Sequence, residues 1–157
     1  MRIEYDIEVA VSVLDAQMTT EELYAGLLLR ALEPMRVNAN ISACEVQFVS
    51  ATHVRRQVIF GALRLEEEVN LYINQGFLIV THPSREQSGG CVSLRIVSAE
   101  NGGLAVRFVY ERPEDISLTD EEKALMPRVL RQMYYGEDLH FMTVLRQLAA
   151  QGLLKLQ

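Results

Sequence analysis

The sequence predicts an α+β fold, in which a curved seven-stranded antiparallel sheet wraps around a long C-terminal helix and one or two short helices follow the first strand. Three observations support this prediction: an opening segment with period-two alternation, a central block of strand-like segments between short turns, and helical periodicity from residue 119 onward. The 157 residues are 49% hydrophobic, with no internal repeat and no linker-like stretch. We therefore expect residues 1–157 to form a single domain.

The opening segment alternates apolar residues with charged or small ones. The apolar positions are Ile3, Tyr5, Ile7, Val9, Val11 and Val13. This period predicts a strand with one buried face. The period changes after Thr19 and Glu22, which have capping-box spacing, and apolar residues then recur at helical intervals up to Leu32. Pro34 either ends this helix or begins a short second one.

The central block lacks a helical period. Its expected strands are 42–50, 53–60, 63–73, 77–82, 91–100 and 104–112. Short turns containing glycine, such as Gly61-Ala62, separate several of them, and short connections join antiparallel neighbours. The block is therefore predicted to be a meander.

The C-terminal segment begins with a second capping-box pair, Thr119 and Glu122, and has a helix stop at Gly152. One helix over 119–152 would be about 50 Å long, which exceeds the expected sheet. Pro127 therefore predicts a short helix over 119–126 and a long one from about 127 to 152. The apolar stripe predicted to cover the sheet is Leu130, Met133, Tyr134, Phe141, Val144, Leu145 and Leu148.

The two-residue loop Gly61-Ala62 determines the register of its hairpin. It pairs Val58 with Leu65 and Arg56 with Glu67, so Arg56 and Glu67 should face each other on the inner side of the sheet. One interpretation is a structural ion pair, since a lone buried charge is costly. Another is a polar anchor that orients a ligand inside an apolar cavity. Acid–base catalysis by Glu67 is disfavoured, because an arginine neighbour makes a carboxylate a poor acid.

The same counting orients the later strands. A loop at 74–76 pairs Ile73 with Phe77 and Leu71 with Ile79, and a loop at 101–103 pairs Ile96 with Phe108 and Leu94 with Tyr110. Tyr5 and Tyr110 would then be inward-facing aromatics whose hydroxyls bind either a ligand or other protein groups. The candidate ligand-binding residues are Tyr5, Arg56, Val58, Glu67, Ile79, Phe108, Tyr110 and Phe141.

Four apolar residues, Leu78, Val80, Val97 and Val109, are predicted on the outer face. They are interpreted either as scattered surface residues or as the face of a homodimer. Two breaks in the helical cover are candidate entry points for a ligand: the connection 31–37 around Pro34, and Gly136. The alternative for Gly136 is that it permits close packing against the sheet.

Charge and composition exclude several functions. Fifteen Lys and Arg against 21 Asp and Glu give a net charge of −6, and no cationic stretch is present, so nucleic acid is not an expected partner. The apolar runs are too short for a membrane span, so integral membrane association is not expected. Cys44 and Cys91 form no disulfide or zinc pattern, and the expected location is the cytoplasm. His53, His82 and His140 lack metal spacing, and no nucleophile motif occurs, so no metal, cofactor or catalytic residue is predicted.

Several segments resemble the AtaL-like family of the SRPBCC superfamily, which includes START and birch-pollen-allergen-like proteins. They are Leu23-Tyr24-Ala25-Gly26-Leu27 with Arg30-Ala31 and Pro34, then Arg55-Arg56 with Phe60-Gly61, and then Glu67-Glu68-Val69. The resemblance covers most of the chain, although Tyr24 stands where the family usually carries a tryptophan. It implies a helix-grip fold with a hydrophobic-ligand pocket between sheet and long helix.

Three functions remain open. The first is binding of a hydrophobic small molecule or lipid, and the second is a cyclase- or dehydratase-type enzyme that uses the same pocket. The third is an interaction or stress-associated module with an incidental cavity. One polar pair in an apolar wall would favour the binder, several convergent polar groups the enzyme, and a filled cavity the third. Since Arg56 with Glu67 is the one charged pair predicted inside, binding ranks above catalysis.

Overall fold

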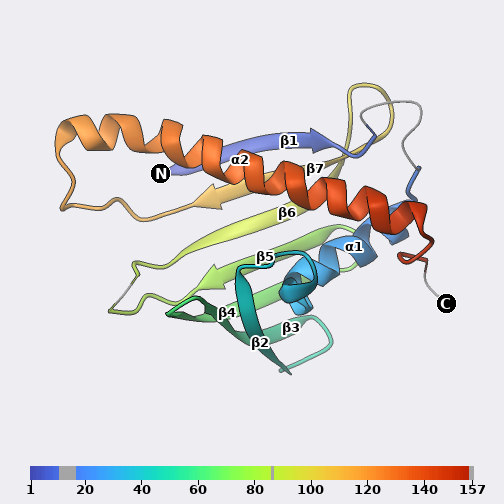
Figure 1. The fold of residues 1–157 in the computed structure, drawn as a ribbon, viewed down its shortest axis with the longest axis horizontal. Helices are drawn as coiled ribbons and strands as arrows, with labels where there is room; N and C mark the ends of the chain where they lie inside the picture. The colour runs from blue at the N-terminus through green and yellow to red at the C-terminus, as the bar shows by residue number, and fades with distance from the viewer. Residues whose placement is uncertain (11–16, 86, 156–157) are drawn as a thin grey trace.

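Seven antiparallel strands form one sheet in the order β1-β7-β6-β5-β4-β3-β2, so the first two strands lie at opposite edges (Figure 1). The computed structural model describes residues 1–10, 17–85 and 87–155. The elements are β1 (Arg2–Glu8), α1 (Thr20–Leu32), η1 (Pro34–Arg36), β2 (Ile41–Phe48), β3 (His53–Phe60), β4 (Leu63–Tyr72), β5 (Gly76–Thr81), β6 (Gly90–Ser98), β7 (Leu104–Glu111) and α2 (Asp120–Ala150). The predicted α+β class, sheet and short helices after the first strand are confirmed.

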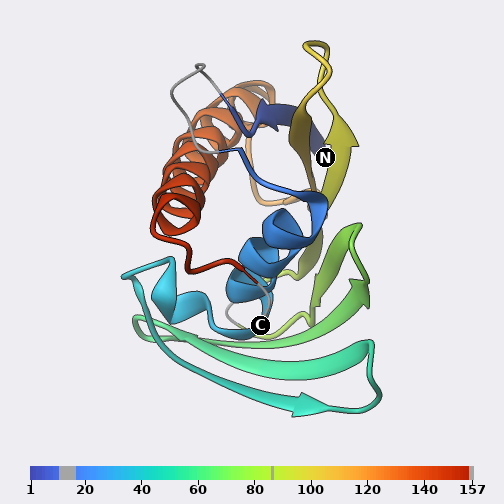
Figure 2. The ribbon, with the colours of Figure 1, turned by 90° about the vertical axis from the view of Figure 1, so that its right-hand side faces the viewer.

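The two α-helices, α1 and α2, lie on the concave side of the sheet, which curves around α1 (Figure 2). Helix α1 packs against β5 and β6, and α2 packs against β1 and α1. Gly26 makes the two helices' close approach feasible, because a Cβ at this position would lie 2.9 Å from Leu145 Cδ2. Leu23, Leu27 and Leu145 are fully buried there. No helix among the described residues has the length and apolar character needed to cross a membrane.

Strand β1 shows the predicted alternation but is shorter than expected. Ile3, Tyr5 and Ile7 are buried, whereas the residues between them are exposed. The ladder pairs Glu8 with Ala105 and is followed by one more bond, from the Val9 N–H to the carbonyl of Leu104, the first residue of β7. The buried alternation continues to Val9. The predicted extension through Val11 and Val13 lies outside the described residues.

Helix α2 corrects the prediction of two helices divided at Pro127. It is one helix of 31 residues, with Pro127 at its eighth position. A proline removes only one N–H from the helical ladder, and the freed carbonyl near this point can be hydrated because the neighbouring helix surface is exposed. The first turns project past the sheet, as Figure 1 shows, so the length of the sheet does not limit the helix. The predicted capping boxes at Thr19 and Thr119 are both present.

The three hairpins differ in how well their register was predicted. The β3–β4 register agrees at every predicted pair, including Arg56 with Glu67. The other two predictions are wrong by two residues: Leu71 pairs with Phe77, and Leu94 pairs with Phe108. In the first of these turns, β4 ends at Tyr72, which pairs with Gly76, so the loop comprises residues 73–75 and the register shifts. Asn74, in the middle of this loop, has a φ of 59°. A shift of two leaves each side chain on its predicted face, because the period of a strand is two.

One prediction about α2 needs correction, and the outer face of the sheet is less exposed than its apolar residues suggested. Met133 was expected on the buried stripe of α2, but it is 49% exposed, because it lies at the margin of the helix face that meets the sheet. On the outer face of the sheet, Val80 is exposed, whereas Leu78, Val97 and Val109 are half-buried among neighbouring side chains. A homodimer through this face stays a prediction.

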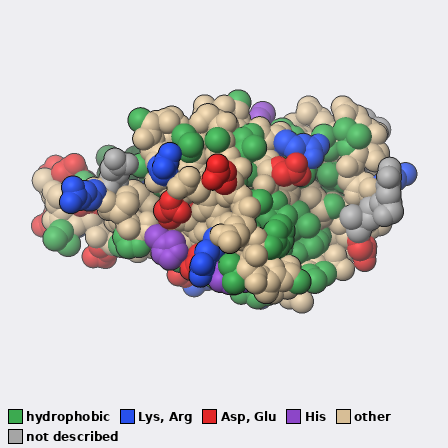
Figure 3. Space-filling model, turned by 90° about the horizontal axis from the view of Figure 1, so that it is seen from below, with side chains coloured by type: hydrophobic (Ala, Val, Ile, Leu, Met, Phe, Trp, Pro, Cys, Tyr) green, Lys and Arg blue, Asp and Glu red, His purple; other side chains and the backbone are tan. Residues whose placement is uncertain are grey.

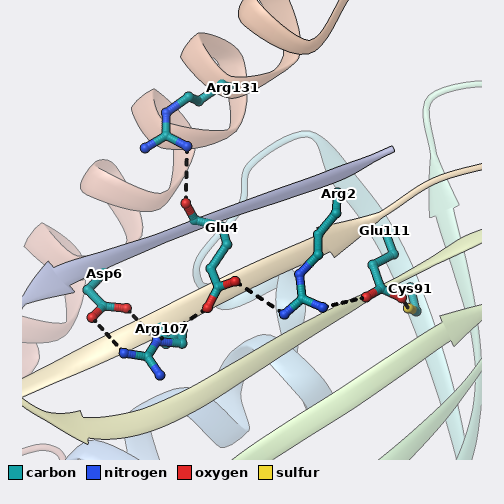
Figure 4. A network of polar contacts seen from close by, with 7 residues as sticks. All are labelled: Arg2, Glu4, Asp6, Cys91, Arg107, Glu111 and Arg131. Carbon is teal, nitrogen blue, oxygen red and sulfur yellow. Dashed lines mark hydrogen bonds and ion pairs between the residues drawn. The ribbon is translucent and has the colours of Figure 1, made fainter.

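Charged residues cover the outer face of β1 and β7 instead (Figure 4). Arg107 Nε and Nη2 donate to the two carboxylate oxygens of Asp6 at 2.9 and 3.1 Å. Arg131 of α2 donates to the Glu4 carbonyl at 3.0 Å and so links the helix to the edge strand. These groups are solvent-exposed, so each contributes little to stability.

The opposite edge of the sheet is more apolar. Val46, Phe48 and Val49, in and just after β2, are 40%, 56% and 49% exposed. The face that carries this edge is shown in Figure 3, where hydrophobic side chains gather between separate acidic and basic ones.

Candidate functional site

A cavity of about 520 Å³ lies between α2, the segment from η1 to β2, and the inner faces of β3 to β6. Its apolar lining consists of Pro34, Val37, Ile41, Ile79, Val92 and Phe141, together with Ala39. This volume is within the range of small-molecule sites. The interior is therefore not completely filled by side chains. A filled interior would have favoured the interaction module, the third of the functions left open by the sequence.

Four of the eight predicted ligand-binding residues line this cavity: Arg56, Glu67, Ile79 and Phe141. The other four, Tyr5, Val58, Phe108 and Tyr110, are buried outside the cavity lining. A ligand contact therefore stays a prediction for all eight residues. The first four could touch a ligand in the cavity without any rearrangement, because they line it.

Arg56 and Glu67 form a buried ion pair, with exposed side-chain fractions of 8% and 7%. Arg56 Nε and Nη2 both lie 2.9 Å from Glu67 Oε1. Arg56 Nη1 donates to the carbonyls of Arg30 and Ala31 at 3.0 and 2.8 Å, so it caps the C-terminal end of α1, where a positive charge is favourable. Thr81 donates its hydroxyl to the other oxygen of Glu67. These bonds support the interpretation as a structural ion pair.

A second buried charge pair, Arg30 with Asp138, lies next to the cavity. Asp138 of α2 is fully buried, and its Oδ1 accepts from Arg30 Nη1 at 2.7 Å. Its Oδ2 accepts the hydroxyls of Tyr5 at 2.5 Å and Tyr110 at 2.7 Å, and Arg30 Nη2 donates to Tyr110 Oη at 3.0 Å. We call Tyr5, Arg30, Tyr110 and Asp138 the Asp138 network. It joins both helices to the edge strand β1 and to its neighbour β7.

The tyrosines of this network act as donors. Burial, together with the nearby Asp138 carboxylate, raises the pKa of Tyr5 far above its usual range, and burial also raises the pKa of Tyr110. Both hydroxyls are thus protonated at any physiological pH and donate to Asp138. The Tyr110 ring also stacks on Tyr134, with centroids 4.0 Å apart. The predicted alternative that protein groups satisfy these hydroxyls is the one the structure shows.

The sequence analysis did not identify Asp138, although a signal exists. Asp138 is four residues after Tyr134 and three before Phe141, and both neighbours belong to the apolar stripe of α2. A carboxylate at the centre of such a stripe must be buried, and it therefore requires a partner. Arg30 carries the corresponding signal on α1, where it follows the buried Leu23 and Leu27 at helical spacing.

Both predicted breaks in the helical cover border the cavity. Pro34 and Val37 lie on one side, and Gly136 lies on the other. A Cβ at Gly136 would meet no atom within 4 Å, so the alternative that Gly136 permits close packing is wrong. Glu137 and His140 also line the cavity from α2, and partial burial together with Asp138 raises the pKa of Glu137.

The other two histidines lie elsewhere but share a partner. His53 Nε2 and His82 Nε2 lie 3.0 and 3.3 Å from the two carboxylate oxygens of Glu68, which Arg55 also contacts. His53 and His82 come close together because β3 and the end of β5 flank β4 at this point. In the part of the chain that the structure describes, no three His, Cys, Asp or Glu side chains form a metal-binding group.

A curved antiparallel sheet that a long C-terminal helix closes over a cavity is the helix-grip architecture of START-like and birch-pollen-allergen-like proteins. The Zhui aromatase/cyclase from Streptomyces sp. R1128 has this fold, with a TM-score of 0.63 at 11% identity over 95% of each chain. A START superfamily protein from Mycobacterium smegmatis gives 0.61 at 10% identity, over 94% of this chain and 98% of that one. The di-domain ARO/CYC protein StfQ from the steffimycin biosynthetic pathway gives 0.68 at 9% identity, over 96% of this chain and 51% of StfQ.

The family model described as AtaL, acetylaranotin biosynthesis cluster protein L, matches residues 4–152, and the chain belongs to this family. No curated protein matches the sequence. The likenesses to solved structures are all at low identity, so they establish the SRPBCC fold and leave the chemistry to be argued from the site.

Proposed function

We propose that this protein binds a hydrophobic small molecule in the cavity between α2 and the sheet. The observation that carries the proposal is the cavity of about 520 Å³, whose wall combines seven apolar residues with a set of polar ones and includes Pro34 and Gly136. A cavity of this size suits a compact ligand of a few fused rings or a short acyl chain better than a two-chain lipid. The family's description refers to a biosynthesis cluster, which supports a small organic ligand.

The test compares two tryptophan substitutions on opposite faces of β6. Val92→Trp adds an indole at a position that lines the cavity, whereas Val97→Trp adds the same group on the outer face. We expect an apolar fluorescent probe to bind the native protein with micromolar affinity, and Val92→Trp to weaken that binding at least about tenfold by occupying the space. Val97→Trp should bind like the native protein. Absence of saturable binding to the native protein would refute the proposal.

Native mass spectrometry of protein purified from its own host would then identify the natural ligand. A co-purifying molecule that Val92→Trp fails to retain would be assigned to the cavity.

A cyclase- or dehydratase-type activity is the second candidate, because one specific observation favours it. Arg30, Glu137 and His140 converge on the cavity in addition to Arg56 and Glu67, which exceeds the single polar pair that the sequence predicted. A carboxyl group with a raised pKa, a histidine and a guanidinium are the components needed to move a proton and stabilise an oxyanion. Turnover of a polyketide-like substrate that His140→Ala and Glu137→Gln abolish, with binding retained, would establish catalysis over simple binding.

A further inference from the structure

We propose that the cavity selects ligands that carry an anionic oxygen, and that Arg30 is the residue that binds this oxygen. This inference rests on the binding function proposed above and specifies the chemical class of the ligand. A carboxylate, phenolate or enolate attached to an apolar body is the class that fits.

The first step compares the two arginines of the cavity wall. Arg56 has protein partners on all three of its nitrogens, and its side chain is 8% exposed. Arg30 is 22% exposed and lines the same cavity. Among the described residues, Arg30 Nη1 and Nη2 have one acceptor each, so each terminal nitrogen retains a second N–H for a ligand. Arg56 keeps a second N–H on Nη2 alone and is the less exposed of the two, so Arg30 is the more available cation.

The second step concerns how Arg30 is held. Asp138 and Tyr110 bind its two terminal nitrogens from the buried side. The guanidinium carbon lies 5.0 Å from the ring centroid of Phe141 and 5.7 Å from that of Phe108. The hydrogen bonds to Asp138 and Tyr110 and the nearby aromatic rings restrict the Arg30 side chain before a ligand binds. Such preorganisation lowers the entropic cost of binding an anion.

The third step concerns charge. The protein carries a net charge of −6, and Glu137 at the cavity adds local negative charge, so the long-range field repels anions. Any preference for an anionic ligand must therefore come from short-range contacts at the cavity wall, where Arg30 is the more exposed of the two arginines. Asp138 offsets part of the Arg30 charge from behind, which makes a specific prediction: removing the charge of Asp138 should strengthen anion binding.

The experiment uses two fluorescent probes that share one aromatic skeleton, 1-anilinonaphthalene-8-sulfonate and uncharged N-phenyl-1-naphthylamine. We expect the sulfonate to bind native protein more tightly than the neutral probe. Asp138→Asn should raise the affinity for the sulfonate by about tenfold, as one unscreened charge at close range can, and leave the neutral probe unchanged. The Arg30→Gln, Asp138→Asn double variant should lower sulfonate affinity to the level of the neutral probe. Arg36→Gln, which removes an exposed arginine of η1, is the charge-matched control.

The outcomes separate this inference from the proposed function. If neither probe binds the native protein, the binding function itself fails. If both bind but Asp138→Asn and the double variant leave the ratio of the two affinities unchanged, the cavity binds ligands without Arg30 and the inference is overturned. Urea denaturation of each variant identifies unfolded protein. Should the double variant not fold, Arg30→Gln alone decides, because a cavity that binds the sulfonate through Arg30 should lose its preference for the sulfonate in this variant.

Discussion

Two buried arginine–carboxylate pairs lie within the same sheet-and-helix interior, and they are built differently. Arg56 and Glu67 are neighbours across one hairpin and have 8% and 7% exposed side chains. Arg30 and Asp138 are 108 positions apart and come from two helices. The hairpin pair is completed by backbone carbonyls and one threonine, whereas Asp138 is completed by the hydroxyls of Tyr5 and Tyr110. The hairpin pair thus forms between adjacent strands, with the end of α1 as a further partner of Arg56, whereas the Asp138 network depends on the packing of four elements.

The largest expected effect is that of Asp138→Ala. It leaves the Arg30 guanidinium and two tyrosine hydroxyls without their shared acceptor in a poorly solvated region. We expect a loss of about 4 kcal/mol in the free energy of unfolding, measured by urea denaturation at pH 7. A loss below about 1 kcal/mol would mean that water reaches the network and that the network does not hold the helices to the sheet.

Arg56→Ala is expected to cost about 3 kcal/mol, because Glu67 loses its counter-charge and the last carbonyls of α1 lose their donor. Replacement of Arg56 and Glu67 together by methionine should recover much of this loss. The same double replacement of Arg30 and Asp138 should recover little, since it leaves the hydroxyls of Tyr5 and Tyr110 unpaired. Equal recovery in both pairs would contradict the distinction between a pair and a network.

A smaller effect is expected when one hydroxyl donor is removed from each carboxylate. Tyr5→Phe removes a bond to fully buried Asp138 and should cost about 2 kcal/mol. Thr81→Val removes a bond to Glu67 at a half-buried position, where water can replace it, and should cost about 1 kcal/mol or less. Thermal unfolding of the two variants in parallel tests which substitution destabilises the protein more. A larger loss for Thr81→Val would mean that Glu67 in the hairpin is less accessible to water than Asp138.

The smallest effect concerns Gly136, which lines the cavity. Gly136→Ala should stabilise the protein by about 1 kcal/mol, because alanine favours the helix and its Cβ meets no atom within 4 Å. If α2 gates the cavity here, stopped-flow release of a bound probe should also slow while the equilibrium affinity stays nearly unchanged. Gly26→Ala is the matched control. Its Cβ would lie 2.9 Å from Leu145 Cδ2, so it should show no gain in stability. Release rates equal to those of the parent would locate the gate elsewhere.

The hairpin pair was predictable because its register depends on a two-residue loop and a period of two, both of which can be counted along the chain. The same counting misjudged two other loops by two residues, yet the inward faces came out correctly. Pro127 was misjudged for a different reason. A local rule about proline was applied to a helix whose first turns project beyond the sheet and face solvent.

The Asp138 network was only half predictable. Tyr5 and Tyr110 were assigned to the interior by strand alternation, and Asp138 stands out as a carboxylate on an apolar helix face. No local pattern pairs Asp138 with Arg30, because their contact depends on the position of α2 along the sheet and on its close approach to α1 at Gly26. The number of polar groups at the cavity was underestimated for the same reason.

By itself, then, the chain determined its strands, its inward faces, its capped helices and one internal ion pair, since each of these follows from periodicity, turn length or contacts within a hairpin. Only the tertiary structure decided that α2 is continuous, that Asp138 meets Arg30 and two tyrosines, and that Pro34 and Gly136 line one cavity. The physical reason is the separation along the chain of the residues that interact. Local patterns record the conformational preferences of neighbouring residues, whereas a cavity and a network of distant charges exist only where packed layers leave space or bring partners together.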